Sequence, residues 1–392
     1  MRILHVVSTM KQSGGVESFL GHTFRAIRRR NLPNLDIEVC YTLGDARLSD
    51  AELDEMGIRA WGVRLGNNPL PFLRNFYREL RVRGPYDVVH AHLSNFCGPP
   101  MQCARRAGVP VRLSHYHNLT AGHRNDWPRR IYERWLNRQV LSNSTGIIAL
   151  TYAGLRLWFP RHAESDPRMF VIRYGIDVAE FEQARARDAV RDELGIPRDA
   201  TLIGHVGRFN WQKNHARLIE AFALLLQQRP EVRLLLVGDG DLRPQIEQQV
   251  NQLGIRPSVT FTGVRRDIPR VLSALDLFVF PSIVEGFGKA LLEAQAAGLT
   301  VASSRIATSC EAVAPPFEPY SCPPEDVPGL ASCMLRGLEA AGRDPALAQQ
   351  ARAFARKFTT DASVDSMLAA WRVPGFTAPL DPFAPAGAAS GC

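Results

Sequence analysis

The residues best suited to chemistry lie in one segment, Pro281 to Gly298, which reads PSIVEGFGKALLEAQAAG. Strong helix formers from Lys289 onward predict a helix that ends at Gly298. Glu285 precedes this helix and Glu293 lies within it, about two turns away, so we expect both carboxylates to face one crevice. Buried carboxylates need hydrogen-bond donors, and sugar hydroxyls supply them. The alternative is a helix cap plus a surface glutamate.

The backbone of the same turn offers a second kind of chemistry. The amides of Phe287, Gly288 and Lys289 come at the start of the predicted helix, where free N–H groups favour phosphate oxygens. Glycine-rich turns are places where function concentrates, which favours a functional Glu285 over a capping one.

A second segment, Gly204 to Asn214, carries two cations, Arg208 and Lys213, after a predicted strand and a glycine turn. Cations at the carboxyl end of a strand and the mouth of a helix are suited to clamping a diphosphate. A solvated basic loop is the alternative interpretation.

Near the N-terminus, Gly14 and Gly15 lie between the first predicted strand and a helix. Such a turn lets the backbone approach an anionic ligand. The full G-x-G-x-x-G spacing is absent, so a tight turn without a ligand explains this pair equally well.

Two pairs of histidines lie at the ends of neighbouring predicted strands. His115 and His117 alternate with Tyr116, so they point to the same side of their strand. Such a pair can bind zinc, but the sequence offers no third ligand of the right kind nearby, and we predict no metal site. His90 and His92 form a similar pair, which we leave outside the catalytic set because packed histidines without chemistry are common.

The elements that must hold these segments are parallel strands alternating with amphipathic helices, which indicates α/β architecture with doubly wound sheets. The chain of 392 residues is also longer than one hydrophobic core usually serves, so we expect two domains. The first set of predicted strands is Arg2–Ser8, Asp36–Tyr41, Ile58–Arg64, Asp87–Ala91, Val109–Ser114, Gly146–Leu150 and Met169–Ile172. The second set is Thr201–Val206, Val232–Val237, Ser258–Thr262, Leu277–Pro281 and Thr300–Ser303.

Composition excludes several classes of protein. With 45% apolar and 22% charged residues and no apolar run near the roughly 18 residues needed to cross a bilayer, the chain does not span a membrane. Residues 1–10 lack the features of a signal peptide, so we expect a cytoplasmic protein. The seven cysteines are scattered and never form C-x-x-C, which indicates reduced packing residues rather than disulfides or zinc ligands.

The net charge of +8 is compatible with nucleic acid, an anionic membrane surface or a phosphate-bearing substrate. No zinc knuckle, basic and aromatic sheet motif or isolated recognition helix occurs, so we predict no nucleic-acid partner. Arginines mixed with aromatic and aliphatic residues in 24–30, 72–83 and 124–138 predict peripheral contact with the inner face of the cell membrane. The alternative is that these helices only cover the sheet.

The segment around Glu285 resembles the retaining glycosyltransferases of family 4, whose second domain carries E-x7-E, with G-F-G between the glutamates and E-A-x-A-x-G at the second. Glu285 to Glu293 has that spacing and that pattern. The other matching segments occur in family order, and only the tail after about Arg372 lies outside the match: Gly14-Gly15-Val16-Glu17, Arg208 with Lys213-Asn214, Gly238-Asp239-Gly240 and Phe261-Thr262-Gly263. The resemblance is strongest to enzymes that build bacterial exopolysaccharide, capsule or lipopolysaccharide.

The resemblance implies the GT-B fold, in which two Rossmann-like domains face each other across a cleft. We expect an acceptor-binding domain over residues 1–180 and a nucleotide-sugar-binding domain over 181–358. Residues 359–372 would form a helix that returns to the first domain, and the Pro-, Ala- and Gly-rich residues 373–392 a disordered tail.

Roles for individual residues also follow from the resemblance. Arg208 and Lys213 would bind the donor diphosphate, Glu285 the sugar ring and Glu293 the ribose, while the Gly14-Gly15 loop closes on the phosphates. A family histidine beside the transferred sugar matches His117 best, with His115 as its competitor. Tyr174 departs from the family, which usually has Asn at this hinge.

We therefore predict a retaining hexosyltransferase without metal or cofactor, using a nucleotide diphosphate sugar, with uridine favoured, and a glycan or polyprenyl-diphosphate-linked acceptor. A glycoside hydrolase could use Glu285 and Glu293 as acid and base, but would have no use for Arg208 and Lys213. A nucleotide-sugar epimerase on the same fold and a non-catalytic nucleotide-sugar-binding protein remain as alternatives.

Overall fold

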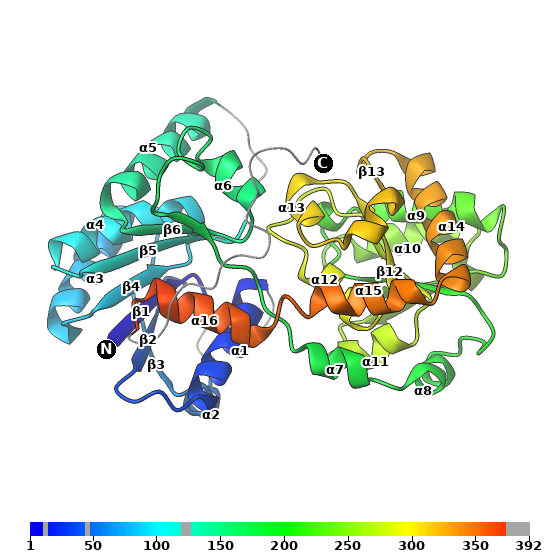
Figure 1. Ribbon diagram of the computed structural model, residues 1–392. Helices are drawn as coiled ribbons and strands as arrows, with labels where there is room; N and C mark the ends of the chain where they lie inside the picture. The colour runs from blue at the N-terminus through cyan, green and yellow to red at the C-terminus, as the bar shows by residue number, and fades with distance from the viewer. Residues whose placement is uncertain (11–14, 44–47, 119–126, 374–392) are drawn as a thin grey trace. The chain divides into compact units, whose positions relative to one another are not determined.

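The computed structural model describes residues 1–10, 15–43, 48–118 and 127–373, and these fall into two compact units (Figure 1). The first unit contains Met1–Gly175 together with residues 360–373, and the second contains Ile176–Thr359. Gly14 and the predicted tail beyond Val373 lie outside the described residues. No helix in the described part of the chain is long and apolar enough to span a membrane.

The first unit is built on a sheet of seven parallel strands in the order β3-β2-β1-β4-β5-β6-β7. Its strands are β1 (Arg2–Val7), β2 (Asp36–Tyr41), β3 (Ile58–Gly62), β4 (Val88–Ala91), β5 (Val111–Tyr116), β6 (Gly146–Ala149) and β7 (Met169–Val171). All of the predicted strands of this unit are present. Strand β5 continues past Ser114, so that His115 lies inside the strand rather than after it.

The helices of the first unit are α1 (Gly15–Arg29), α2 (Asp50–Met56), α3 (Pro69–Arg83), α4 (Gly98–Arg106), α5 (Trp127–Asn143), α6 (Tyr152–Trp158) and α16 (Thr360–Ala370). The last of these comes from the far end of the chain and packs against α1. Arg30, just after α1, pairs with Asp361 and Asp365 of α16.

The second unit has six parallel strands in the order β10-β9-β8-β11-β12-β13. They are β8 (Leu202–Val206), β9 (Arg233–Val237), β10 (Val259–Gly263), β11 (Leu277–Phe280), β12 (Thr300–Ser304) and β13 (Ser321–Cys322). Strand β13 was not predicted, because two residues are too few to show the alternation that marks a strand.

The helices of the second unit are α7 (Val178–Gln183), α8 (Arg187–Glu193), α9 (His215–Leu226), α10 (Arg243–Gln252), α11 (Ile268–Ser273), α12 (Lys289–Ala296), α13 (Ala307–Cys310), α14 (Val327–Arg343) and α15 (Ala346–Ala355). Short 3-10 turns, including η2 (Trp211–Lys213), complete it. Both units are therefore doubly wound α/β structures, as the sequence predicted.

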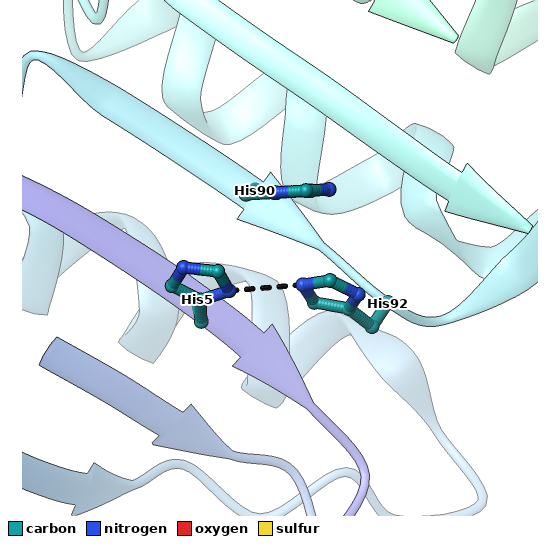
Figure 2. A group of neighbouring side chains, drawn as sticks. All are labelled: His5, His90 and His92. Carbon is teal, nitrogen blue, oxygen red and sulfur yellow. Dashed lines mark hydrogen bonds between the residues drawn. The ribbon is translucent and has the colours of Figure 1, made fainter. Parts of the chain in front are cut away.

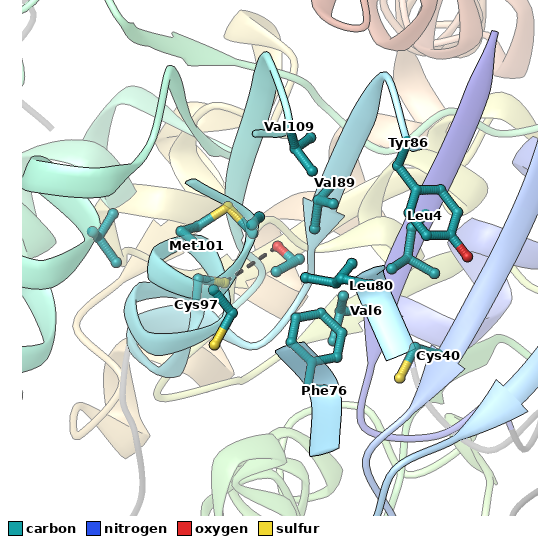
Figure 3. Packing of buried hydrophobic residues seen from close by; sticks show 14 of the residues in the cluster. Leu4, Val6, Cys40, Phe76, Leu80, Tyr86, Val89, Cys97, Met101 and Val109 are labelled. Carbon is teal, nitrogen blue, oxygen red and sulfur yellow. Dashed lines mark hydrogen bonds between the residues drawn. The ribbon is translucent and has the colours of Figure 1, made fainter. Parts of the chain in front are cut away.

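Side-chain alternation gives the two faces of the first sheet different contents. Leu4 and Val6 of β1 enter an apolar core with Phe76 and Leu80 of α3 (Figure 3). Burial of each such side chain contributes about 1.5–3 kcal/mol to folding. His5 lies between them in sequence and so points to the opposite face, where it meets Phe24 of α1 and Trp371, which follows α16.

The order of the strands reverses at one point in each sheet. In the first unit this switch lies between β1 and β4, and in the second between β8 and β11. In open α/β sheets, ligands bind outside the carboxyl ends of the strands at such a switch. The topology therefore predicts that ligand-binding residues lie in the segments that follow these four strands.

One buried arginine ties together the beginnings of the two switch strands of the second unit. Arg191 of α8 has no exposed surface and donates to Asp276 Oδ2 (2.9 Å), to the carbonyl oxygen of Ala274 and to those of Arg198 and Ala200. Asp276 Oδ2 also accepts from the amide of Leu202, the first residue of β8 (2.7 Å). The Arg191 guanidinium and the Asp276 carboxylate therefore help to fix the register of β8 against β11.

We predict that Arg191→Met destabilises the second unit by about 3–5 kcal/mol, because it removes a buried donor that serves Asp276 and several carbonyl groups at once. Urea unfolding followed by circular dichroism measures this loss. Arg198→Met is the matched control, since Arg198 is exposed and pairs with Asp192 at the surface. Equal stability of the two variants would contradict the assigned role of Arg191.

Candidate active site

The turn after β8 is held by a close approach of two backbone segments. The amide of Gly207 donates to the carbonyl oxygen of Val237 (2.9 Å). Gly238 has φ of 135°, and a Cβ atom there would lie 2.0 Å from the carbonyl oxygen of Gly207. Only glycine therefore fits at 238, and this contact fixes the turn from which Arg208 extends to the surface.

Hydrogen bonds join the two segments that the sequence singled out, Gly204 to Asn214 and Pro281 to Gly298. Asn214 donates from Nδ2 to the carbonyl oxygens of Pro281 (3.0 Å) and Pro324 (2.9 Å). The amide of Ile283 donates to the carbonyl oxygen of Gln212 (2.8 Å). Asn214 had no role of its own in the sequence argument, since its contacts become visible only once β8 and β11 lie side by side.

Both glutamates of the E-x7-E pattern are paired with lysines. Lys213 forms an ion pair with Glu285, and Lys289 forms one with Glu293 across one helical turn (3.0 Å). The carboxylate side chains are largely buried, with 16% and 14% of their surfaces exposed. Lys213 Nζ also lies 5.1 Å from the centre of the Phe280 ring.

These pairs make a site that can exchange partners. Phosphate oxygens entering next to Lys213 and Lys289 would take over the ammonium groups and leave the carboxylates available to hydroxyl donors. The role of the Lys289 side chain was not anticipated, because the sequence argument used only its amide. The i, i+4 spacing of Lys289 and Glu293 was the signal that could have shown it.

The start of α12 provides hydrogen-bond donors beside these pairs. Gly288 precedes the helix with φ of 104° and no side chain caps it. Within the described chain, the amides of Phe287, Gly288 and Lys289 donate to no acceptor. The ring of Phe287 is buried against Phe358 (5.7 Å between centres), so it anchors the turn while its amide remains a donor.

The equivalent position of the first unit is filled by histidines. His5 on β1, His90 and His92 at the end of β4, and His115 and His117 at the end of β5 have between 0% and 6% of their surfaces exposed. Figure 2 shows three of them, with His5 Nδ1 directed at His92 Nε2 (2.9 Å). We call these five residues the histidine cluster.

The histidine cluster corrects one step of the sequence argument, which found no third metal ligand near His115 and His117. His92 supplies such a ligand from the neighbouring strand, and His5, His90 and His92 form a second set of three. In each set the ligand atoms lie within 4.8 Å of one another. These distances would allow a metal ion, but a ring nitrogen can bind one only if it carries no proton.

Trp371 decides where two of these protons lie. Its indole N–H can only donate, and it points at His90 Nδ1 (3.1 Å). His90 Nδ1 must therefore be the acceptor, so a neutral His90 carries its proton on Nε2. This N–H donates to His115 Nδ1 (3.2 Å). His115 then carries its own proton on Nε2. Neither His90 nor His115 retains a lone pair for a metal, and each set of three is left with two ligands.

Burial keeps the histidine cluster neutral. Desolvation lowers the pKa of His5 and of His117 to about 3, and it lowers the pKa values of His90, His92 and His115 well below their ordinary value. In the unfolded chain these side chains would titrate near 6.5. The unfolded state therefore binds more protons than the folded state below this pH, and stability must rise with pH.

We predict that the first unit loses stability as the pH falls below about 6.5, with full stability above it. Each histidine contributes about 1.4 kcal/mol of lost stability at pH 5.5, so five approach the total of about 5–15 kcal/mol typical of a domain. Tryptophan fluorescence reports mainly this unit, which holds all the tryptophans except Trp211. A free energy of unfolding that stays constant between pH 7.5 and 5.5 would refute the neutral cluster.

At the N-terminal end of α1, Gly15 begins the helix and Phe19 follows one turn later. Phe19 stacks on Tyr174 (4.6 Å between ring centres) and lies 6.1 Å from His117. Tyr174 donates to or accepts from His117 Nδ1 at 2.9 Å. Tyr174 thus links His117 to the N-terminal end of α1, which begins at Gly15.

Models of two protein families match the chain, one to each unit. The model of the glycosyl transferase 4-like domain matches residues 14–175, and the model of glycosyl transferases group 1 matches residues 186–357. The second match contains Arg208, Lys213 and both glutamates.

Curated proteins and solved structures agree with these matches. EpsF of Bacillus subtilis, named as a glycosyltransferase, is 33% identical over 301 residues, which cover 76% of this chain and 77% of EpsF. The UDP-Gal:alpha-D-GlcNAc-diphosphoundecaprenol alpha-1,3-galactosyltransferase of Escherichia coli is 26% identical over 67% of this chain and 69% of its own.

Among solved structures, Anabaena HepE in complex with UDP has a TM-score of 0.76 at 21% identity, covering 94% of this chain and 98% of HepE. WaaG, a glycosyltransferase involved in lipopolysaccharide biosynthesis, has a TM-score of 0.71 at 18% identity, over 95% of this chain and all of WaaG. With two parallel α/β units and the residues of the E-x7-E segment in place, the chain belongs to the glycosyltransferases of the group 1 and 4-like type, and it is a transferase with the GT-B fold.

Proposed function

We propose that this glycosyltransferase moves a hexose, with retention of configuration, from a uridine diphosphate sugar to a glycan or polyprenyl-diphosphate-linked acceptor in bacterial surface polysaccharide biosynthesis. The observation that carries the proposal is the pairing of Lys213 with Glu285 and of Lys289 with Glu293 beside the open amides of α12. Cations and amides stabilise the charge that develops on a departing diphosphate.

The division of labour within this site follows from position. Arg208 and Lys213 bind the diphosphate together with the amides of Phe287, Gly288 and Lys289. Glu285, in the turn, orients the sugar ring, and Glu293, inside α12, binds the ribose hydroxyls.

His117 is the histidine that we assign to the transferred sugar. His115 has no exposed surface and is held in one protonation pattern by His90 and Trp371. His117 lies just past the end of β5, is 3% exposed and bonds the hydroxyl of Tyr174, which packs on Phe19 of α1. These contacts favour His117 over its competitor.

Names of related proteins support the donor and the setting. HepE was solved with UDP and with UDP-glucose. The relative from Escherichia coli is named for a UDP-galactose donor and a diphosphoundecaprenol-linked acceptor. WaaG is described as acting in lipopolysaccharide biosynthesis.

We predict that Glu285→Gln and Glu293→Gln separate turnover from binding. Glu285→Gln should lower kcat by on the order of 100-fold through misplacement of the sugar, while leaving UDP affinity equal or slightly raised because Lys213 loses its competing partner. Glu293→Gln should weaken UDP binding by about 10- to 100-fold through loss of charged hydrogen bonds to ribose. Isothermal titration with UDP and initial rates with UDP-sugars measure the two effects.

UDP lacks the sugar, so it is the ligand that discriminates between the glutamates. If Glu285→Gln loses UDP affinity as severely as Glu293→Gln does, the assigned roles are wrong. Conversion of the donor to an isomer without transfer would instead favour an epimerase.

We further propose that α5 docks on an anionic lipid surface. Trp127, Ile131, Tyr132 and Trp135 are exposed on this helix, Trp127 to 73%, while Leu136 and Val140 are buried behind them. Arg134 and Arg138 lie exposed one turn apart on the same side as Trp127 and Trp135. Aromatic residues flanked by arginines suit the boundary between headgroups and acyl chains, where each cation adds about 1 kcal/mol.

The other two basic stretches, residues 24–30 and 72–83, do not expose their aromatic side chains in this way. Phe24 of α1 and Phe72 and Phe76 of α3 are buried in the first unit, so their aromatic residues cover the sheet. We therefore confine the proposed lipid-binding surface to α5.

We predict that the protein sediments with vesicles containing phosphatidylglycerol, and less with pure phosphatidylcholine, at low salt. The double variant Trp127→Ser/Trp135→Ser should lose most of this binding, because it removes the exposed apolar contacts. Val264→Ser is the control, since Val264 is 75% exposed in the second unit. Equal recovery with both kinds of vesicle would reject the docking surface.

A further inference from the structure

The turn that carries Glu285 is held on one side by the segment that follows β8. The amide of Ile283 donates to the carbonyl oxygen of Gln212 (2.8 Å), and Asn214 Nδ2 donates to that of Pro281 (3.0 Å). Both contacts lie before Glu285 in sequence, so they fix the start of the turn.

A threonine on the other side of the turn makes a contact at Glu285 itself. Thr308, in α13, donates from Oγ1 to the carbonyl oxygen of Glu285 (2.7 Å) and has no exposed surface. Helix α13 follows β12, and β11 lies between β8 and β12 in the sheet. The turn after β11 is therefore held by the segments that follow both of its neighbouring strands.

The segment that carries Thr308 is itself fixed to the sheet. Arg305, which lies between β12 and α13, donates its amide to the carbonyl oxygen of Cys322 (2.6 Å). Its guanidinium donates to the carbonyl oxygen of Ser321 (2.8 Å). Both acceptors belong to β13. The hydroxyl of Thr308 is therefore presented to Glu285 from an anchored backbone.

A hydrogen bond to the Glu285 carbonyl oxygen fixes more than one atom. The peptide group between Glu285 and Gly286 is planar, so holding its oxygen sets the rotation of the whole plane. The glycine that follows places few limits on this rotation by itself. Rotation of the plane about the bond to the Glu285 Cα changes the direction in which the carboxylate leaves the turn. Thr308 therefore controls where that carboxylate points.

We propose that Thr308 is a positioning residue for the transfer, and that its hydroxyl holds the Glu285 carboxylate in the direction that the donor sugar requires. The proposal rests on the transferase function argued above, in which Glu285 orients the sugar ring. Thr308 acts through Glu285, because its side chain is buried and its hydroxyl is donated to the Glu285 carbonyl. Small misplacements of an orienting group cause large losses of rate.

One NMR signal tests this hydrogen bond in the full chain without any activity measurement. Glutamate is followed by glycine only at Glu285-Gly286 in the sequence. Carbon-13 in glutamate carbonyl groups and nitrogen-15 in glycine amides therefore give a single correlation, and its carbon shift responds to the hydrogen bond at the Glu285 oxygen. We expect this signal to move in Thr308→Val and to stay near its original position in Thr308→Ser. An unmoved signal in Thr308→Val would overturn the proposal.

Kinetic measurements on the same variants test the positioning role. Thr308→Val keeps the shape of the side chain and removes the hydroxyl donor. We expect kcat with a UDP-sugar to fall about tenfold and UDP affinity to stay unchanged, because UDP has no sugar for Glu285 to orient. Thr308→Ser keeps the donor and should recover most of kcat. If Thr308→Val loses UDP affinity as severely as it loses kcat, Thr308 has only a structural role and the proposal fails.

Ser309→Ala is the matched control from the same short helix. Ser309 is fully buried, and its hydroxyl donates to the carbonyl oxygens of Ile306 (3.2 Å) and Ser304 (3.4 Å), within its own segment. We expect this variant to retain the kcat of the unmodified protein. If Ser309→Ala lowers kcat as much as Thr308→Val does, the loss comes from the packing of α13 and contradicts the proposal.

The two kinds of measurement also separate this inference from the proposed function. If the unmodified protein transfers no sugar from any UDP donor, the proposed function fails, while the NMR signal still shows whether Thr308 holds the turn. If transfer occurs and Thr308→Val is as active as Ser309→Ala, only the role of Thr308 fails.

Discussion

Parallel strands bring all their carboxyl ends to one edge of a sheet, and this constraint governs both units. At the switch between β8 and β11, the edge receives the turn with Arg208 and the turn with Glu285, which are far apart in sequence. Arg191 and Asp276 fix the opposite ends of the same two strands. The geometry of the candidate donor site is therefore set partly by an ion pair between a buried arginine and a half-buried aspartate at the other end of the sheet.

The two units solve the problem of burying polar groups at this edge in different ways. The second unit keeps charges and balances them, with each glutamate next to a lysine in a partly exposed position. Such pairs can be exchanged for ligand groups, because water and incoming phosphate can reach them. The first unit buries five imidazoles almost completely, so that desolvation keeps them neutral, and hydrogen bonds join them to one another.

A neutral imidazole is a donor at one nitrogen and an acceptor at the other, so a single donor-only partner can order several rings. Trp371 has this effect on His90 and His115, although it follows the last helix of the chain. The C-terminal segment therefore contributes to the electrostatics of β4 and β5 and not only to packing against α1. The same logic explains why histidines within ligand distance of one another need not form a metal site.

The sequence by itself determined the order and type of the elements, because alternation and helical periodicity are local properties of the chain. It also determined the E-x7-E segment and the segment with Arg208 and Lys213, since their chemistry is carried by residues close in sequence. The sequence did not predict strand β13, because two residues are too few to show the alternation of a strand. The tertiary structure alone decided which side chains meet: Asn214 with Pro281, Lys213 with Glu285, and His92 with His117. It also decided that Trp371 directs the ring protons of His90 and His115. Those contacts join residues on different strands or at opposite ends of the chain, and no local pattern records a distance that only folding creates.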